Sequence, residues 1–157
     1  MSLSENLLSL LSAKNLKIST AESCTGGLIG AAITAVPGAS EFFIGGCIAY
    51  DNRIKEKLLG VPQDVLENYG AVSSQTVEAM AEGAARLFET DCAISVSGIA
   101  GPEGGTPQKP VGLVYIGIFI KDHIYSFEHR FTGGRECIRK LTMDAALDHL
   151  CRILETL

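Results

Sequence analysis

The segment AESCTGG at residues 21–27 carries two side chains that can act as nucleophiles, Ser23 and Cys24. A strand is expected before it and a helix from about Thr25 onward. Unpaired amide groups and the positive end of the helix dipole converge at such a junction, where they can hold an oxyanion or a phosphate. The expected oxyanion or substrate-binding residues are Cys24, Thr25, Gly26 and Gly27. The same residue types also form an ordinary helix cap, which the spacing alone favours.

Ser23 and Cys24 place different demands on their surroundings. A cysteine at a helix N-terminus has a lowered pKa and high reactivity. A serine needs a neighbouring base. The histidines lie outside every Gly-rich segment, which disfavours Cys–His and Ser–His–Asp arrangements. They are His123, His129 and His149.

The segment YDNRIK at residues 50–55 is an alternative source of a base. Tyr50 ends an apolar run, and Lys55 falls about one turn into the helix that follows. A lysine shielded from water loses its proton more readily, and a tyrosine beside it can relay that proton. The residue pattern leaves open whether Lys55 is this base or a solvent-exposed charge.

Two further segments could hold an anion. A Gly/Pro-rich loop at residues 98–110 is longer than a simple connection requires, and its amides could form an anion-binding nest. Gly133 and Gly134 precede a predicted helix that carries arginines, which suits a phosphate. The alternatives are a flexible surface loop and a plain helix cap. The candidate residues are Ser97, Gly104, Gly105, Thr106, Lys109, Arg135 and Arg139. No cluster of Asp, Glu or His has metal-ligand spacing, so no metal site is predicted.

These segments must be positioned by a larger framework. Three of them follow short apolar runs, which is typical of strands covered on both faces. The order of elements predicts one domain over residues 1–157, a three-layer α/β/α sandwich with a mixed sheet. Sheets of this kind bind ligands at the carboxyl ends of their strands. The predicted strands cover residues 16–20, 46–50, 92–97, 111–120 and 124–131. The predicted helices cover residues 2–15, 25–34, 52–59, 62–68, 73–88 and 135–154. The expected inner face of the last helix consists of Ile138, Leu141, Ala145, Ile153 and Leu157.

Composition narrows the class of protein. The chain has 157 residues, 46% of them hydrophobic, and a net charge of −5. This charge has the wrong sign for duplex DNA, so no nucleic acid partner is expected. No apolar run is long enough to span a membrane, and no secretory signal precedes the first helix. The 5 cysteines include no C-x-x-C pair, so a cytoplasmic protein with free thiols is expected. The sequence leaves open whether the chain forms a homo-oligomer.

Five motifs in order resemble the CinA C-terminal domain family, which includes the PncC-type nicotinamide-nucleotide amidohydrolases. They are AESCTGG, IAYDNRIKEKLLGV, GAVS, SVSGIAGPEGGTPQKPVG and the Gly-Gly-Arg before the last helix. The resemblance covers roughly Leu7 to Leu154. It implies the single-domain form, because no length remains for the N-terminal pyrophosphatase-like domain of full-length CinA.

The resemblance also implies an activity. The family hydrolyses the carboxamide of nicotinamide mononucleotide, a small-molecule nucleotide, to nicotinic acid mononucleotide and ammonia, with no metal or organic cofactor. Ser23 would be the nucleophile, with Tyr50 and Lys55 as proton-transfer partners. The family more often reads Thr-Tyr-Ser-Asn where this chain has Ala49 to Asn52, which bears on substrate preference and rate. The alternatives are a non-catalytic nucleotide-binding module of the same fold and an amidase that uses Cys24.

Overall fold

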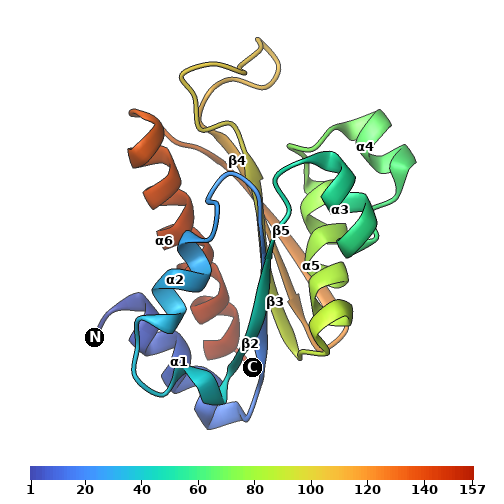
Figure 1. The fold of residues 1–157 in the computed structure, drawn as a ribbon. Coiled ribbons are helices and arrows are strands. Elements are labelled where there is room, and N and C mark those ends of the chain that lie inside the picture. The colour runs from blue at the N-terminus through green and yellow to red at the C-terminus, as the bar shows by residue number, and fades with distance from the viewer.

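Five strands form a single mixed sheet in the computed structural model, which describes residues 1–157 (Figure 1). The strands are β1 (Ile18–Glu22), β2 (Phe43–Ile48), β3 (Cys92–Gly98), β4 (Leu113–Ile120) and β5 (His123–Arg130). Their order across the sheet is β2-β1-β3-β4-β5. β1 runs parallel to both β2 and β3, whereas β4 is antiparallel to β3 and to β5. The predicted mixed sheet is therefore confirmed.

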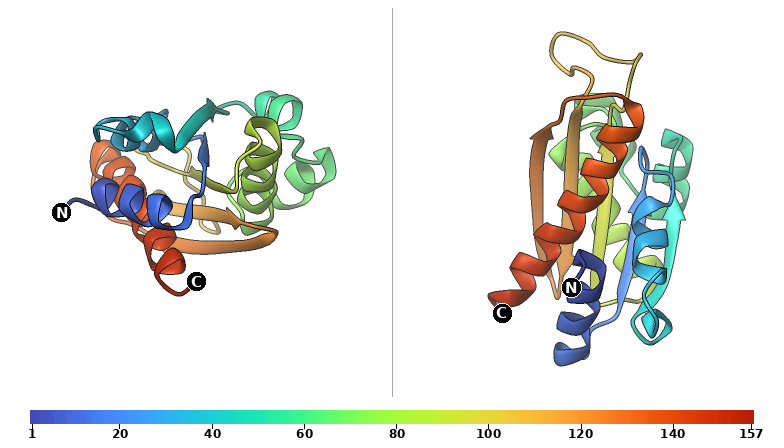
Figure 2. Two further views of the ribbon diagram at one scale, coloured as in Figure 1. Left: turned by 90° about the horizontal axis from the view of Figure 1, so that it is seen from below. Right: turned by 90° about the vertical axis from the view of Figure 1, so that its left-hand side faces the viewer.

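Helices cover both faces of this sheet, which gives the predicted three layers (Figure 2). The helices are α1 (Leu3–Lys14), α2 (Leu28–Thr34), α3 (Asn52–Leu59), α4 (Gln63–Tyr69), α5 (Ser74–Phe88) and α6 (Arg135–Glu155), with a short 3-10 helix at Ala39–Glu41. α1, α2 and α6 lie on one face, and α3, α4 and α5 lie on the other. Each layer of helices encloses its own hydrophobic cluster against the sheet.

Local sequence signals account for several element boundaries. Ser2 and Glu5 form a reciprocal capping box at the start of α1, and Asn15 ends that helix in a left-handed conformation. Ser73 accepts the amide of Thr76 and so caps α5. These capping interactions fix helix ends that the apolar pattern alone would leave uncertain by a turn.

The inner face of α6 differs from the prediction. Ile138 is buried as expected, but Leu141 is 37% exposed and Leu157 is 58% exposed. The buried residues of α6 are Ile138, Thr142, Ala146, Leu147, Leu150, Cys151 and Leu154. Apolar side chains are spread around this helix, so its orientation is decided by packing against α1 and the sheet.

The position of β1 between two parallel neighbours determines where a ligand site can form. The chain leaves β1 through α2 on one face to reach β2, and it reaches β3 through α3, α4 and α5 on the other face. The carboxyl ends of β1, β2 and β3 therefore meet at one edge of the sheet, at a topological switch point. This is the predicted convergence of three strand-end segments.

The start of α2 is a second departure from the prediction. The helix begins at Leu28 and not at Thr25. Gly26 and Gly27 have φ angles of 58° and 109°, in the left-handed region that glycine adopts readily. Residues 23–27 consequently form a tight loop outside the helix, and this loop carries both candidate nucleophiles.

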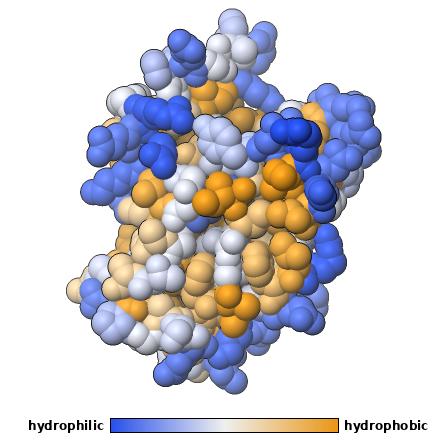
Figure 3. Space-filling view, in the orientation of Figure 1, coloured by the Kyte–Doolittle hydropathy of each residue, from blue (hydrophilic) through white to orange (hydrophobic).

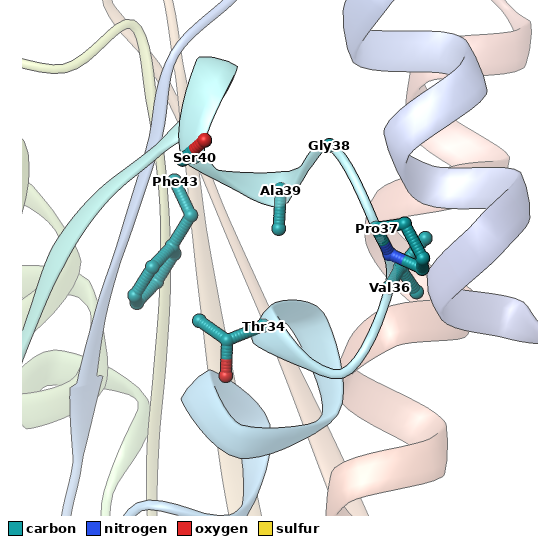
Figure 4. A pocket seen from close by; sticks show the side chains of 7 residues that line it. All are labelled: Thr34, Val36, Pro37, Gly38, Ala39, Ser40 and Phe43. Carbon is teal, nitrogen blue, oxygen red and sulfur yellow. The ribbon is translucent and has the colours of Figure 1, made fainter.

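Two other surface features are an apolar face and a hollow that carries no ionisable side chain. Figure 3 shows apolar residues gathered on the face that β2 presents, and Ile44 and Ile48 of this edge strand are exposed. A hollow of about 410 Å³ lies near the start of β2, at the end of the sheet away from the strand carboxyl ends (Figure 4). It is lined by Thr34, Val36, Pro37, Gly38, Ala39, Ser40 and Phe43, none of which is ionisable. None of the helices is both long and apolar enough to cross a membrane.

Candidate active site

Ser23 and Lys55 meet at the carboxyl ends of the parallel strands. Ser23 directly follows β1, and Lys55 lies on the first turn of α3. Lys55 Nζ lies 3.1 Å from Ser23 Oγ, within hydrogen-bond distance. The Lys55 side chain is 1% exposed, so it is not a solvated surface charge. The sequence left open whether Lys55 is shielded from water, and the structure shows that it is.

The burial of Lys55 makes its proton easier to lose than that of an exposed lysine. Its Nζ donates to the main-chain oxygens of Ala49 at 2.8 Å and Tyr50 at 3.0 Å, and no carboxylate forms a salt bridge with it. Burial lowers the pKa of Lys55, an effect partly opposed by the negative charge of Asp51. A neutral amine has two N–H bonds, which the two carbonyls accept. Its lone pair is then free to receive the hydroxyl proton of Ser23.

A cavity of about 220 Å³ opens over this pair. Six of the sequence candidates line it, namely Ser23, Cys24, Tyr50, Lys55, Ser97 and Arg135. They come from the ends of β1, β2 and β3 and from the starts of α3 and α6. Five other lining residues were not predicted, namely Asn52, Ala71, Val72, Gly98 and Ala100. Asn52 lies within the YDNRIK segment and Ala71 within the GAVS motif, but their side chains gave no chemical signal.

Glu22 organises the loop that carries Ser23. Its buried carboxylate accepts the hydroxyl of Thr25 at 2.6 Å and the amides of Gly27, Ile29 and Gly30 at 3.2, 2.9 and 2.9 Å. The sequence pattern did not predict this role for Glu22. The only available signal was a carboxylate placed immediately before a glycine-rich turn.

These contacts correct the predicted oxyanion donors. The amide of Gly27 donates to Glu22, and that of Gly26 donates to the carbonyl of Ser23 at 3.1 Å. Neither amide is therefore available to a ligand. Thr25 is completely buried, and Cys24 is the only one of the four predicted residues that lines the cavity.

The thiol of Cys24 does not have the reactivity expected at a helix N-terminus. Burial raises its pKa to about 11, which overturns the expected lowering. No histidine lines the cavity. His129 and His149 bind each other through their Nε2 atoms at 2.7 Å, between β5 and α6, and His123 is exposed in the β4–β5 hairpin.

We expect Cys24→Ala to retain most of the hydrolytic activity proposed below. Burial raises the pKa of the Cys24 thiol to about 11, and the thiol forms no hydrogen bond with Lys55, so we expect Ser23 and not Cys24 to be the attacking group. The measurement is activity with and without prior treatment by iodoacetamide, for the wild type and the variant. Loss of activity in Cys24→Ala, together with alkylation-sensitive activity in the wild type, would instead support the cysteine amidase alternative.

The hydroxyl of Tyr50 does not reach Lys55. It accepts a hydrogen bond from Arg135 Nη2 at 3.2 Å, and the Tyr50 side chain is 59% exposed. The contact of this residue with Lys55 runs through its main-chain carbonyl. The predicted direct proton relay through the phenol is therefore wrong, although the ring still lines the cavity.

The predicted phosphate donors separate into two groups. Arg135 lines the cavity and also donates to the Gly101 carbonyl at 2.8 Å. Arg139 donates to the carbonyls of Cys24 and Thr25 at 3.0 and 2.9 Å, so it holds the loop.

The donors predicted from the long loop lie elsewhere. Gly104, Gly105, Thr106 and Lys109 do not line the cavity, and the Lys109 side chain donates to the Tyr69 carbonyl at the end of α4. The structure does not bring them to this cavity, because the loop extends away from the strand ends (Figure 1).

The fold is an α/β sandwich with its candidate site at the topological switch point. The chain belongs to the CinA C-terminal domain family, whose sequence model matches residues 1–154. A CinA-like protein of Dictyoglomus thermophilum is 56% identical over 151 residues, which make up 96% of this chain and 37% of that relative. A CinA-like protein of Thermotoga maritima is 46% identical over 151 residues and likewise extends well beyond the match, which takes up 37% of its length. The chain thus spans little more than a third of these relatives.

Solved structures share the fold along almost the entire chain. The competence/damage inducible protein CihA from Agrobacterium tumefaciens superposes with a TM-score of 0.93 at 39% identity, covering 98% of this chain and 93% of that one. A CinA superfamily protein from Klebsiella pneumoniae gives a TM-score of 0.95 at 32% identity, covering 99% and 97%. The family predicted from the five motifs is confirmed.

Proposed function

We propose that the chain hydrolyses the carboxamide of nicotinamide mononucleotide to nicotinic acid mononucleotide and ammonia. One observation carries the proposal: a serine hydroxyl lies 3.1 Å from a buried lysine amine that has no carboxylate partner. Burial lowers the pKa of this amine, which favours its use as a general base. The amide substrate follows from the family resemblance, and the protein would act on this small nucleotide in the cytoplasm.

The proposed acylation step uses Ser23, Lys55 and the Cys24 amide. Neutral Lys55 takes the hydroxyl proton while Ser23 Oγ forms a bond to the carboxamide carbon. The amide N–H of Cys24 donates to the oxygen that becomes negatively charged. When the carbon–nitrogen bond breaks, the protonated Lys55 returns this proton to the leaving nitrogen, which departs as ammonia. An ester between Ser23 and the nicotinoyl group is left.

The proposed deacylation step repeats this chemistry with water. Water enters the place that ammonia has left and gives a proton to Lys55 as its oxygen attacks the ester carbon. Lys55 then passes that proton to Ser23 Oγ as the ester bond breaks. The carboxylic acid product leaves, and both side chains return to their starting protonation states.

The size of the cavity suggests how the nucleotide would lie. A volume of about 220 Å³ is small for a whole mononucleotide, because sites for drug-sized ligands usually reach roughly 300–1,000 Å³. A second hollow of about 570 Å³ adjoins it along α6, and Arg135 lines both. We place the pyridine ring over Ser23 and the ribose phosphate beyond Arg135, the nearest cation at the cavity mouth.

A direct assay tests the proposal. Purified protein is incubated with nicotinamide mononucleotide, and ammonia and the acid product are quantified against a blank without protein. Stoichiometric release of both supports the function. No release above the blank, from protein that unfolds cooperatively, contradicts it.

The pH dependence of kcat/KM should report the protonation of Lys55. The base acts only when neutral, so the rate should rise with pH and level off above the pKa of Lys55, which burial lowers. Asp51 raises that pKa. We therefore expect Asp51→Ser, which keeps an N-cap side chain for α3, to shift the rise to lower pH. A shift to higher pH, or none, would contradict Lys55 as the base.

A further inference from the structure

The loop that carries Ser23 is held between a buried acid and an arginine. Residues 23–27 lie in neither helix nor strand, and among them only Ser23 pairs with a strand, through its amide, which donates to the Val96 carbonyl at 3.1 Å. Glu22 binds the hydroxyl of Thr25 and three amides on one side, and Arg139 binds two successive carbonyls on the other. Glu22 and Arg139 are called the loop clamp below.

The loop clamp forms hydrogen bonds within the protein through amides and a guanidinium that could otherwise bind an anion. The amides of Gly27, Ile29 and Gly30, which Glu22 accepts, are donors of the kind that bind an anion at a helix start. Arg139 directs its Nε to the Cys24 carbonyl and its Nη2 to the Thr25 carbonyl. The Nε and Nη2 atoms of Arg139 are therefore used within the protein, whereas its Nη1 makes no hydrogen bond and Arg139 also lines the second hollow.

The contacts of the loop clamp extend to the reacting groups. The Cys24 amide belongs to the same peptide plane as the Ser23 carbonyl, which accepts the amide of Gly26. The Gly26 amide in turn shares a plane with the Thr25 carbonyl that Arg139 binds. Since peptide units are planar, fixing one carbonyl fixes the direction of the amide across from it. Two linked planes thus connect Arg139 to the Cys24 amide.

We propose that Glu22 and Arg139 are positioning residues that together hold Ser23 Oγ and the Cys24 amide in their reactive geometry. This inference rests on the proposed function and extends it, because it assigns Arg139 to the loop and not to the substrate phosphate. The acid holds the loop through amides, and the arginine holds it through carbonyls. Each ionic side chain also satisfies main-chain groups that would otherwise be left unpaired in a buried turn.

Steady-state kinetics separate positioning from ligand binding. Glu22→Gln places an amide donor against at least one α2 amide, and Arg139→Lys replaces a two-point donor with a single ammonium. We expect kcat to fall about 100-fold in each, the scale of a misplacement near 1 Å, with little change in KM. Both variants should lose the same factor on nicotinamide riboside, which lacks the phosphate. A higher KM for the nucleotide alone in Arg139→Lys would overturn the assignment by making Arg139 a phosphate ligand.

A control variant and a second pair of variants support the kinetic test of Glu22. Glu82→Gln changes an exposed acid on α5 and should leave kcat unaltered. If Glu22→Gln does not fold, Thr25→Val removes one contact of Glu22 without altering any charge, and it should lower kcat while Thr25→Ser restores it. Wild-type kcat in folded Glu22→Gln, or in folded Thr25→Val, would overturn the proposal.

Hydrogen–deuterium exchange tests the loop clamp independently of activity. The amides of residues 24–30 should exchange faster in Glu22→Gln than in the wild type, while those of α5 stay unchanged. Equal exchange in the two proteins would overturn the loop clamp even if the wild type is active. Faster exchange in a wild type that releases no ammonia would support the loop clamp and contradict the proposed hydrolysis.

Discussion

Ser23→Ala is expected to reduce ammonia release from nicotinamide mononucleotide by roughly 10³-fold or more, the scale seen when a serine nucleophile is removed. Without Oγ no ester can form, and only unassisted attack by water on the bound amide is left. The fold should tolerate the change, because alanine fits the space of serine and the main-chain contacts of the loop persist. The measurement is ammonia release under single-turnover conditions.

The affinity of Ser23→Ala for the nucleotide shows whether the loss of ammonia release comes from lost catalysis or from lost binding. Calorimetric titration of Ser23→Ala with nicotinamide mononucleotide should give a dissociation constant close to that of the wild type. A suitable control is Ser40→Ala, which alters an exposed serine beside the hollow in Figure 4, at the far end of the sheet. If neither the wild type nor Ser23→Ala releases ammonia but both bind the nucleotide, the non-catalytic binding module is the better description.

Lys55→Met is the second change with a large expected effect. Methionine has nearly the length of lysine and no basic group, so Ser23 would lose its proton acceptor. General bases contribute about 10²–10⁴-fold to rate, and we expect kcat to fall within that range. The measurement is kcat across the pH range, in which the rise assigned to Lys55 should disappear.

The change in kcat of Lys55→Met is informative only if the variant folds. The change leaves the carbonyls of Ala49 and Tyr50 without their lysine donor, which costs about 1–3 kcal/mol for a buried acceptor. Removal of a desolvated amine offsets part of this loss. Lys57→Met provides the control, because Lys57 lies on the same helix and is exposed. A folded Lys55→Met protein with wild-type kcat would eliminate the proposed base.

Much of the framework could be predicted because its signals are local. Apolar runs identified all five strands, and α3 has the predicted bounds of Asn52 to Leu59. The hairpin was also predictable, and Lys121 and Asp122 turn it with positive φ angles. The inner face of α6 was not predictable, since Thr142 and Ala146 face inward only because of their packing partners.

The candidate site was predictable as a meeting of segments, but its internal contacts were not. Parallel strands bring their carboxyl ends to one edge, so Ser23 and Lys55 could be expected nearby. The contact between Arg139 and Cys24 joins residues 115 positions apart, and no spacing rule reaches so far. The hydroxyl of Tyr50 was assigned wrongly because its rotamer is set by Arg135, a residue of another element.

The two carbonyls that hold Lys55 have a consequence for the charge balance of the cleft. In the proposed resting state they accept a neutral amine, so Lys55 carries no charge when a neutral amide enters. In the proposed reaction an ammonium appears at residue 55 in the same step as the negative oxygen beside Cys24, and both vanish together when ammonia departs. The ammonium and the oxyanion would then exist only at the same time and next to each other. Their mutual attraction would offset the cost of placing each charge in a buried site.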